Sequence, residues 1–375
     1  MSMIRAVALC ALALVLAVAN AGCAKLGYYT QAIGGQLEIL SKRQPIESLL
    51  QDPKTDTQLR AQLAAVLAIR AFASNDLALP DNKSYRTYVD LKRQYAVWNV
   101  FAAPELSLTP LQWCFIVVGC INYRGYFSPA GADKFADKLR EQGYDVYVGG
   151  VTAYSTLGWF RDPVLNTMLR NSETDVAALI FHELAHQRVY VRDDTVFNES
   201  FAVTVEREGV KRWLARSGTK EQFQRYLLRK QRHAQFVDLV MRFRQRLIEL
   251  YATTKPDSQK RALKASLFSE LRADYVRLKQ SWNGYAGYDE WFARDLNNAH
   301  LVPLGLYHQY VPAFQTLLAQ HDGNLPAFYQ AVEEIGKLPK TERVARLQSL
   351  QPDKVSRSYS GTRGHSRRAS WRMLE

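Results

Sequence analysis

Apolar side chains recur at helical spacing along most of this chain. Between residues 31 and 70, positions such as Ile39, Ile46, Leu63 and Leu67 fall on one face of a helix. The same periodicity returns in the second half, where charged side chains fill the intervening positions. It predicts further helices over 131–142, 174–190, 197–214, 220–253, 258–280, 311–320 and 326–335.

Three shorter stretches have the pattern of strands instead. Residues 88–101 and 144–156 alternate and are rich in aromatic side chains, and 113–118 is a compact apolar run suited to a buried strand. Few strands among many helices predict an α+β fold. We expect it to be predominantly helical, with a small β-sheet beside the helix at 174–190.

The first 22 residues have the pattern of a signal peptide. Arg5 precedes an almost unbroken apolar stretch over 6–19, which is too short for a stable transmembrane helix. Ala21-Gly22-Cys23 resembles a bacterial lipobox, and Cys23 would then carry a lipid that anchors the protein to a membrane. Ala19-Asn20-Ala21 is equally a site for ordinary signal cleavage, which would release a soluble periplasmic protein. Because a cysteine falls at this point, we favour a lipid-anchored protein of the bacterial cell envelope that faces the periplasm.

The positive charge is partly concentrated at the C-terminus. Of the net charge of +13, the segment 353–375 supplies four, with six basic residues against two acids. Its scarcity of apolar side chains predicts a disordered basic tail over 351–375, after a single domain at 23–350. Neither an RNA-binding signature nor a helix-turn-helix pattern occurs, so we expect no nucleic-acid partner.

Two cysteines remain in the predicted mature domain besides Cys23. Cys114 and Cys120 would meet an oxidising compartment after export, which favours a disulfide if the chain between them folds back. On a straight strand the two sulfur atoms would lie too far apart to bond. Two buried thiols are therefore the alternative.

The segment His182-Glu183-Leu184-Ala185-His186 carries the strongest chemical signal. Histidines four residues apart on a helix present both imidazoles to one ion, and Glu183 can reach a zinc-bound water as general base. The preceding residues 176–181 are apolar, so the motif lies on a buried helix. Two histidines and a glutamate are costly there unless they bind something. The motif therefore predicts a Zn²⁺ site that hydrolyses a peptide or protein substrate.

Catalytic zinc requires a third protein ligand, and the next helix offers two candidates. Glu199 and Glu206 lie seven residues apart and so on nearly the same helix face. One would bind zinc, and the other could orient a histidine or be solvated. A structural zinc site is disfavoured because no cysteine lies near the motif.

Three stretches resemble a known family. Residues 27–38, the segment Tyr123-Arg-Gly-Tyr-Phe127 and residues 182–206 are similar to those of bacterial predicted aminopeptidases, and Asn198-Glu199 resembles the glutamate helix of gluzincin metallopeptidases. The resemblance implies a gluzincin-like architecture, zinc at His182, His186 and Glu199, and a catalytic Glu183. It also implies aminopeptidase activity. The alternatives are an endopeptidase and a non-catalytic envelope assembly or binding lipoprotein on the same fold.

The remaining parts of a peptidase site are less marked in the sequence. A donor should stabilise the oxyanion of the tetrahedral intermediate. Residues 149–154 could form the edge strand that pairs with an extended substrate, or an ordinary sheet edge. The candidate oxyanion donors lie late in the chain. Tyr307 and His300 are the first candidates, and Tyr285, Tyr288 and His308 are the others.

Overall fold

The computed structural model describes residues 27–115, 119–153, 155–158 and 160–351, apart from the side chains of residues 306–308. The predicted signal peptide at 1–22, Cys23 and all of the predicted basic tail except Gln351 lie outside the described residues. Within the ranges described, no helix combines the length and the apolar character that crossing a membrane requires.

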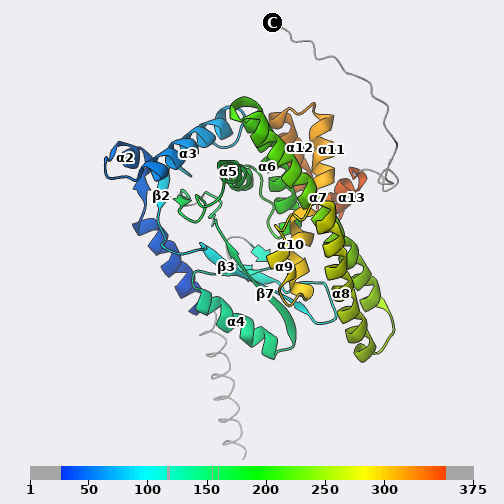
Figure 1. The fold of residues 1–375 in the computed structure, drawn as a ribbon. Helices are drawn as coiled ribbons and strands as arrows, with labels where there is room; N and C mark the ends of the chain where they lie inside the picture. The colour runs from blue at the N-terminus through cyan, green and yellow to red at the C-terminus, as the bar shows by residue number, and fades with distance from the viewer. Residues whose placement is uncertain (1–26, 116–118, 154, 159, 352–375) are drawn as a thin grey trace, which may run out of the picture.

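Helices dominate the described chain, as the apolar periodicity predicts (Figure 1). A first helix ends at residue 41. It is followed by α2 (Ile46–Gln51), α3 (Thr57–Asn75), α4 (Pro129–Glu141), α5 (Glu173–Arg188), α6 (Thr195–Ser217), α7 (Lys220–Ala252), α8 (Asp257–Ser281), α9 (Asp289–Phe292), α10 (Asn298–His308), α11 (Val311–Gln320), α12 (Leu325–Lys337) and α13 (Lys340–Ser349). The α+β, predominantly helical fold class is confirmed.

The strands form three small sheets rather than one. In the first, β1 (Gln44–Pro45) pairs with β2 (Thr87–Val89), which pairs with β8 (Val164–Leu165). In the second, β3 (Val97–Pro104) lies between β6 (Arg124–Tyr126) and β7 (Tyr144–Val151), antiparallel to both. The third is a two-stranded hairpin of β4 (Trp113–Phe115) and β5 (Gly119–Ile121).

The hairpin corrects the prediction for residues 113–118. The described part of the expected buried strand, β4, is not buried, because Cys114 is exposed and Trp113 and Phe115 are half-buried. The pairing of β4 with β5 places Cys114 opposite Cys120, and the two form a disulfide. For residues 113–115, the apolar pattern therefore did not indicate burial.

Helix α5 runs through the middle of the molecule (Figure 1). Ser172 caps it by accepting a hydrogen bond from the Asp175 amide at 3.3 Å. Phe181 is fully buried and lies against Phe72 of α3. On α6, a Cβ atom at Gly209 would come within 2.7 Å of the Phe181 ring, so glycine lets the two helices approach closely. The histidine helix is thus enclosed by α3 and α6.

A side-chain bridge fixes the turn between α5 and α6. The Asn198 side chain accepts from the Val191 amide and donates to the Val191 carbonyl, both at 2.7 Å. Asp194 caps α6 by accepting from the Phe197 amide at 3.2 Å. These contacts set where α6 begins, and so where the next residue, Glu199, is presented.

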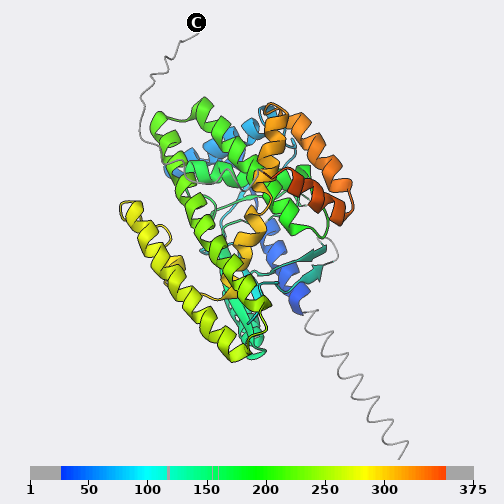
Figure 2. The same ribbon diagram turned by 90° about the vertical axis from the view of Figure 1, so that its right-hand side faces the viewer.

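Helices α7 and α8 form a long antiparallel pair at one side of the molecule (Figure 2). They enclose a second apolar core that includes Phe236, Leu271 and Phe292. A largely buried ion pair between Lys264 of α8 and Asp145 of β7, at 2.6 Å, joins this pair to the central sheet. The sheet is covered by α4 through a third core.

We predict that Arg343 of α13 holds the start of α6 in place. Its Nε donates to the Asp194 carboxylate at 2.8 Å, and both side chains are buried. Removing one partner of a buried pair leaves the other charge without compensation. Arg343→Ala should therefore lower the free energy of unfolding by about 3–5 kcal/mol in chemical denaturation.

Arg346→Ala is the matched control, because this arginine is an exposed residue of the same helix. It should change the free energy of unfolding by less than about 0.5 kcal/mol. Equal effects of the two substitutions would show that the Arg343–Asp194 pair does not stabilise the fold.

Candidate metal centre

Two histidines one helical turn apart form the base of the site. His182 and His186 lie on the same face of α5, and their Nε2 atoms are 3.2 Å apart. The rings are nearly perpendicular, at 82°. The α5 helix thus turns two ring nitrogens towards one point, as four-residue spacing requires.

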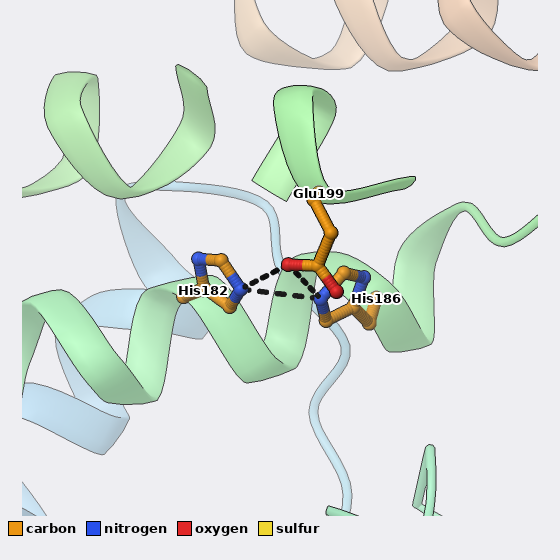
Figure 3. A group of neighbouring side chains, drawn as sticks. All are labelled: His182, His186 and Glu199. Atoms are coloured by element: carbon orange, nitrogen blue, oxygen red, sulfur yellow. Dashed lines mark hydrogen bonds and ion pairs between the residues drawn. The ribbon is translucent and has the colours of Figure 1, made fainter. Parts of the chain in front are cut away.

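Glu199 completes the group from the opposite helix. Its carboxylate points down from α6 onto the two histidines (Figure 3). Its Oε2 atom lies 3.3 Å from His182 Nε2 and 3.7 Å from His186 Nε2. The side chains of His182, His186 and Glu199 are only 12%, 8% and 11% exposed. These three donor atoms could hold a metal ion.

The hydrogen bonding of the group suits a ligand. Glu199 Oε2 and His186 Nδ1 are buried and accept or donate no hydrogen bond among the described residues. Burial opposes ionisation of Glu199, but the His186 and His182 imidazoles outweigh it and lower its pKa to about 2. An ionised carboxylate and two imidazoles are a typical donor set for a divalent metal ion.

Glu206 supports the group from behind. Its Oε2 lies 3.3 Å from His182 Nδ1, and its Oε1 accepts from Lys230 Nζ at 3.0 Å. A carboxylate on Nδ1 holds that nitrogen protonated and leaves the Nε2 lone pair for a metal. Burial raises the pKa of Glu206, but its partners His182 and Lys230 outweigh this effect and lower the pKa to about 2. Of the two candidate ligands, the structure therefore brings Glu199 to the histidines and uses Glu206 to orient one of them.

Glu183 lies beside the metal ligands and lines the same cavity. Its burial raises its pKa, and the Glu199 and Asp162 charges add to this effect, while His182 and His186 oppose it. A carboxylate with a raised pKa accepts a proton more readily than one in water. The position and the environment of Glu183 therefore suit a general base.

Next to Glu183, a loop is organised by Asp162, a residue that the sequence did not single out. The buried Asp162 carboxylate accepts from the Thr156 amide at 3.0 Å, from its hydroxyl at 2.6 Å and from the Gly158 amide at 3.3 Å. Ser155, Thr156 and Leu157 of this loop line the cavity. Asp162 thus fixes one rim of the site.

The cavity has a volume of about 1010 Å³ and opens beside the metal group. Phe115 and Ile121 of the hairpin, with Val97 and Phe127, give it an apolar wall. Gly150 and Val151 at the end of β7 also line the cavity, as do Thr152 and Ala153 after it. Because the sheet order is β6–β3–β7, β7 is an edge strand among the described residues.

The disulfide hairpin is attached to the loop between the two ligand helices. The Cys120 amide donates to Asp193 Oδ1 at 2.6 Å. Gly119 has a positive φ of 77°, and a Cβ atom there would meet the same Asp193 oxygen. The cross-linked hairpin therefore contributes a cavity wall and contacts the loop that precedes Glu199.

The expected oxyanion donors lie elsewhere. His300 accepts from the Asn297 amide in a helix cap and lies against the Tyr147 ring. Tyr285 and Tyr288 pack against the second core. None of these three lines the cavity. The side chains of Tyr307 and His308 lie outside the described part of the structure.

Three other tyrosines line the cavity instead, Tyr28, Tyr123 and Tyr190, and the Glu199 charge acts on the last two. Burial raises the pKa of Tyr123, and the nearby charges of Glu199 and Glu183 raise it further. Burial and the Glu199 charge also raise the pKa of Tyr190. Both phenols are thus protonated donors at neutral pH. Tyr123 belongs to the Tyr-Arg-Gly-Tyr stretch. In the sequence, only the family resemblance marked this stretch as a possible part of the site.

Comparison with known proteins gives one result. Residues 27–347 match the model of a protein family described as "Putative aminopeptidase". Neither the curated proteins nor the solved structures contain a match. The matched range includes the metal group, Glu183 and every residue that lines the cavity.

We predict unequal roles for the two glutamates of α6. Glu199→Ala removes a donor atom and should abolish metal retention after dialysis. Glu206→Ala leaves all three donors and should weaken metal affinity about 10–100-fold, because His182 loses its orienting partner. Metal content by mass spectrometry and metal titration would measure both effects.

Glu208→Ala is the control on the same helix, since Glu208 pairs with Lys211 and Arg212 away from the site. It should retain the metal fully. Greater metal loss in Glu206→Ala than in Glu199→Ala would reverse the assignment of the ligand.

Proposed function

Starting from the premise that the chain belongs to the putative aminopeptidase family, we propose that it is a zinc-dependent aminopeptidase of the gluzincin type. One observation carries the proposal. Two histidine nitrogens and a carboxylate oxygen converge in a cavity that also holds Glu183, a glutamate without an ion pair among the described residues. A structural metal site has no use for such a group, whereas hydrolysis needs one.

Zinc fits the dimensions of the donor triangle. The three donor atoms are 3.2, 3.3 and 3.7 Å apart. Tetrahedral zinc with bonds of about 2.0–2.1 Å separates neighbouring ligand atoms by about 3.3–3.4 Å. When bound, zinc would supply Lewis acidity that polarises the scissile carbonyl and lowers the pKa of water. His182, His186 and Glu199 would hold it and leave one side open to the cavity.

Glu183 would move the proton. The residue lies on α5 between the two histidine ligands and faces the cavity. It would take a proton from the attacking water and pass it to the leaving amine. The raised pKa of Glu183 makes its carboxylate a stronger base towards the attacking water. The same raised pKa keeps the proton on Glu183 until it passes to the leaving amine.

We further propose Tyr123 as the oxyanion donor in place of the late-chain candidates. Its phenol lies near both Glu199 and Glu183, whereas the charges that act on Tyr190 are those of Glu199, Asp193 and Arg192. A protonated hydroxyl near both the ligand and the base is suited to donate to the developing oxyanion. Tyr190 is the comparison residue.

The substrate backbone would pair with β7. Asn297 Nδ2 donates to the Val146 carbonyl, which marks the outer edge of this strand. Because backbone groups alternate along a strand, Gly150 presents its amide and carbonyl on that same edge. Gly150 also lines the cavity. An extended peptide added there would run past the metal group.

We also propose the bacterial cell envelope as the location. The apolar stretch at 6–19 and the lipobox-like Ala21-Gly22-Cys23 support export and a lipid anchor on Cys23. The Cys114–Cys120 disulfide agrees with an oxidising compartment.

Glu183→Gln tests the mechanism. The amide keeps the size of the side chain but cannot accept the proton, so peptide hydrolysis should fall at least about 10²-fold with metal content unchanged. Release of N-terminal residues from a peptide library, followed by mass spectrometry, measures the loss. Retained hydrolysis would exclude Glu183 as the base.

The same library separates the rival functions for the wild-type protein. Internal cleavage would indicate an endopeptidase. Metal binding without any cleavage would favour a non-catalytic binding protein on this fold.

Tyr123→Phe tests the oxyanion donor. Loss of one donor should lower kcat about 10²–10³-fold with little change in KM, because the hydrogen bond forms chiefly in the transition state. Tyr190→Phe should change kcat by less than about threefold. The reverse order of effects would transfer the role to Tyr190.

A further inference from the structure

Nearly every charged side chain that lines the cavity has a partner or a proposed role. Asp175 binds Arg229 of α7 at 2.9 Å. Lys230 binds Glu206, and Glu199 faces the histidines. Glu183 is the proposed base. Among the described residues that line the cavity, these contacts leave one charged side chain unassigned.

That side chain is Arg207 of α6. It lines the cavity and forms no ion pair within the described part of the chain, and its Nε atom is buried without a hydrogen-bond partner. Its backbone is fixed, because the Tyr226 hydroxyl donates to the Arg207 carbonyl. Burial lowers the pKa of Arg207, while the Glu206 charge opposes this effect. A guanidinium whose Nε is buried without a partner is costly unless it binds an anion.

Apart from the proposed base, the described residues that line the cavity offer Arg207 no free acid. Lys230 and His233 line the same part of the cavity. Burial and the charges of Lys230 and Arg207 lower the pKa of His233 to about 4, which leaves its imidazole neutral at pH 7. The Glu206 carboxylate is already shared between His182 and Lys230. An additional anion would therefore meet a site with uncompensated positive charge.

We propose that Arg207 binds a carboxylate of the peptide substrate and so anchors the end opposite to the scissile bond. The inference rests on the proposed peptidase function and names its substrate class. A guanidinium presents paired N–H donors that match the two oxygens of a carboxylate, which makes the contact specific as well as attractive.

Helix geometry sets the length of that substrate. Arg207 follows Glu199 by eight residues on the continuous helix α6, which places their Cα atoms about 12 Å apart along its axis. An extended peptide covers about 3.4 Å per residue. This helical rise equals the length of about three to four residues of an extended peptide. Tripeptides and tetrapeptides with a free C-terminus fit this spacing.

The test compares peptides that differ in one group. Leu-Ala-Ala with a free C-terminus should be cleaved with a kcat/KM at least about tenfold above that of its C-terminal amide, and Arg207→Gln should bring this ratio close to one. Arg207→Lys should restore part of the preference. A third peptide, Leu-Ala-Asp amide, carries the carboxylate on a side chain and distinguishes the two sources of the anion.

Lys211→Gln is the matched control. Lys211 is an exposed cation of the same helix that pairs with Glu208, and it does not line the cavity. This variant should keep the wild-type ratio between free and amidated peptide. Metal content and melting temperature of both variants would verify that the fold and the metal centre are intact.

A binding measurement separates this inference from the proposed function. In the Glu183→Gln background, calorimetry should give tighter binding of Leu-Ala-Ala than of its amide, and Arg207→Gln should remove the difference. If no peptide is hydrolysed, the peptidase proposal fails while this binding result still decides the role of Arg207. A wild type without a preference for the carboxylate, or a preference unchanged by Arg207→Gln, would overturn the inference.

Discussion

The structure depends on the cost of burying polar groups on its central helix. His182, Glu183 and His186 lie on α5, which α3 and α6 enclose. Taken out of water, the two histidines require partners, and α6 supplies them as Glu199 and Glu206. The position of α6 relative to α5 is therefore the constraint on which the site rests. Asn198 bridges the turn between the helices, and Asp194 caps α6.

Glu206 connects the metal centre to the rest of the cavity. One oxygen faces His182 and the other binds Lys230 of α7, so the carboxylate is fully used. The neighbouring Arg207 is therefore left without an acid of its own. The same helix thus provides the ligand, the orienting carboxylate and an unpaired cation.

The sequence predicts the metal helix well and the cavity poorly. Helical periodicity and the four-residue spacing of His182 and His186 depend on local geometry, so they locate α5 and the ligand face. The choice between Glu199 and Glu206 depends on where α6 crosses α5. Seven residues keep both on one face but separate them by about 10 Å along the axis, which periodicity cannot resolve. Tyr123 and Asp162 reach the site from loops and strands distant in sequence, and nothing in their local pattern marks them.

A single rigid element carries both ends of the proposed substrate site. Glu199 and Arg207 lie on one unbroken helix, so the separation of their Cα atoms is fixed by α6. The apolar wall is different, because Phe115, Ile121 and Phe127 present neither charge nor side-chain hydrogen-bonding groups to a bound peptide. Such a site discriminates between peptides by their length and their charged end more than by their sequence. A family description that refers to the amino end of the substrate is compatible with this, since a short peptide held by its carboxylate presents its first residue to the metal.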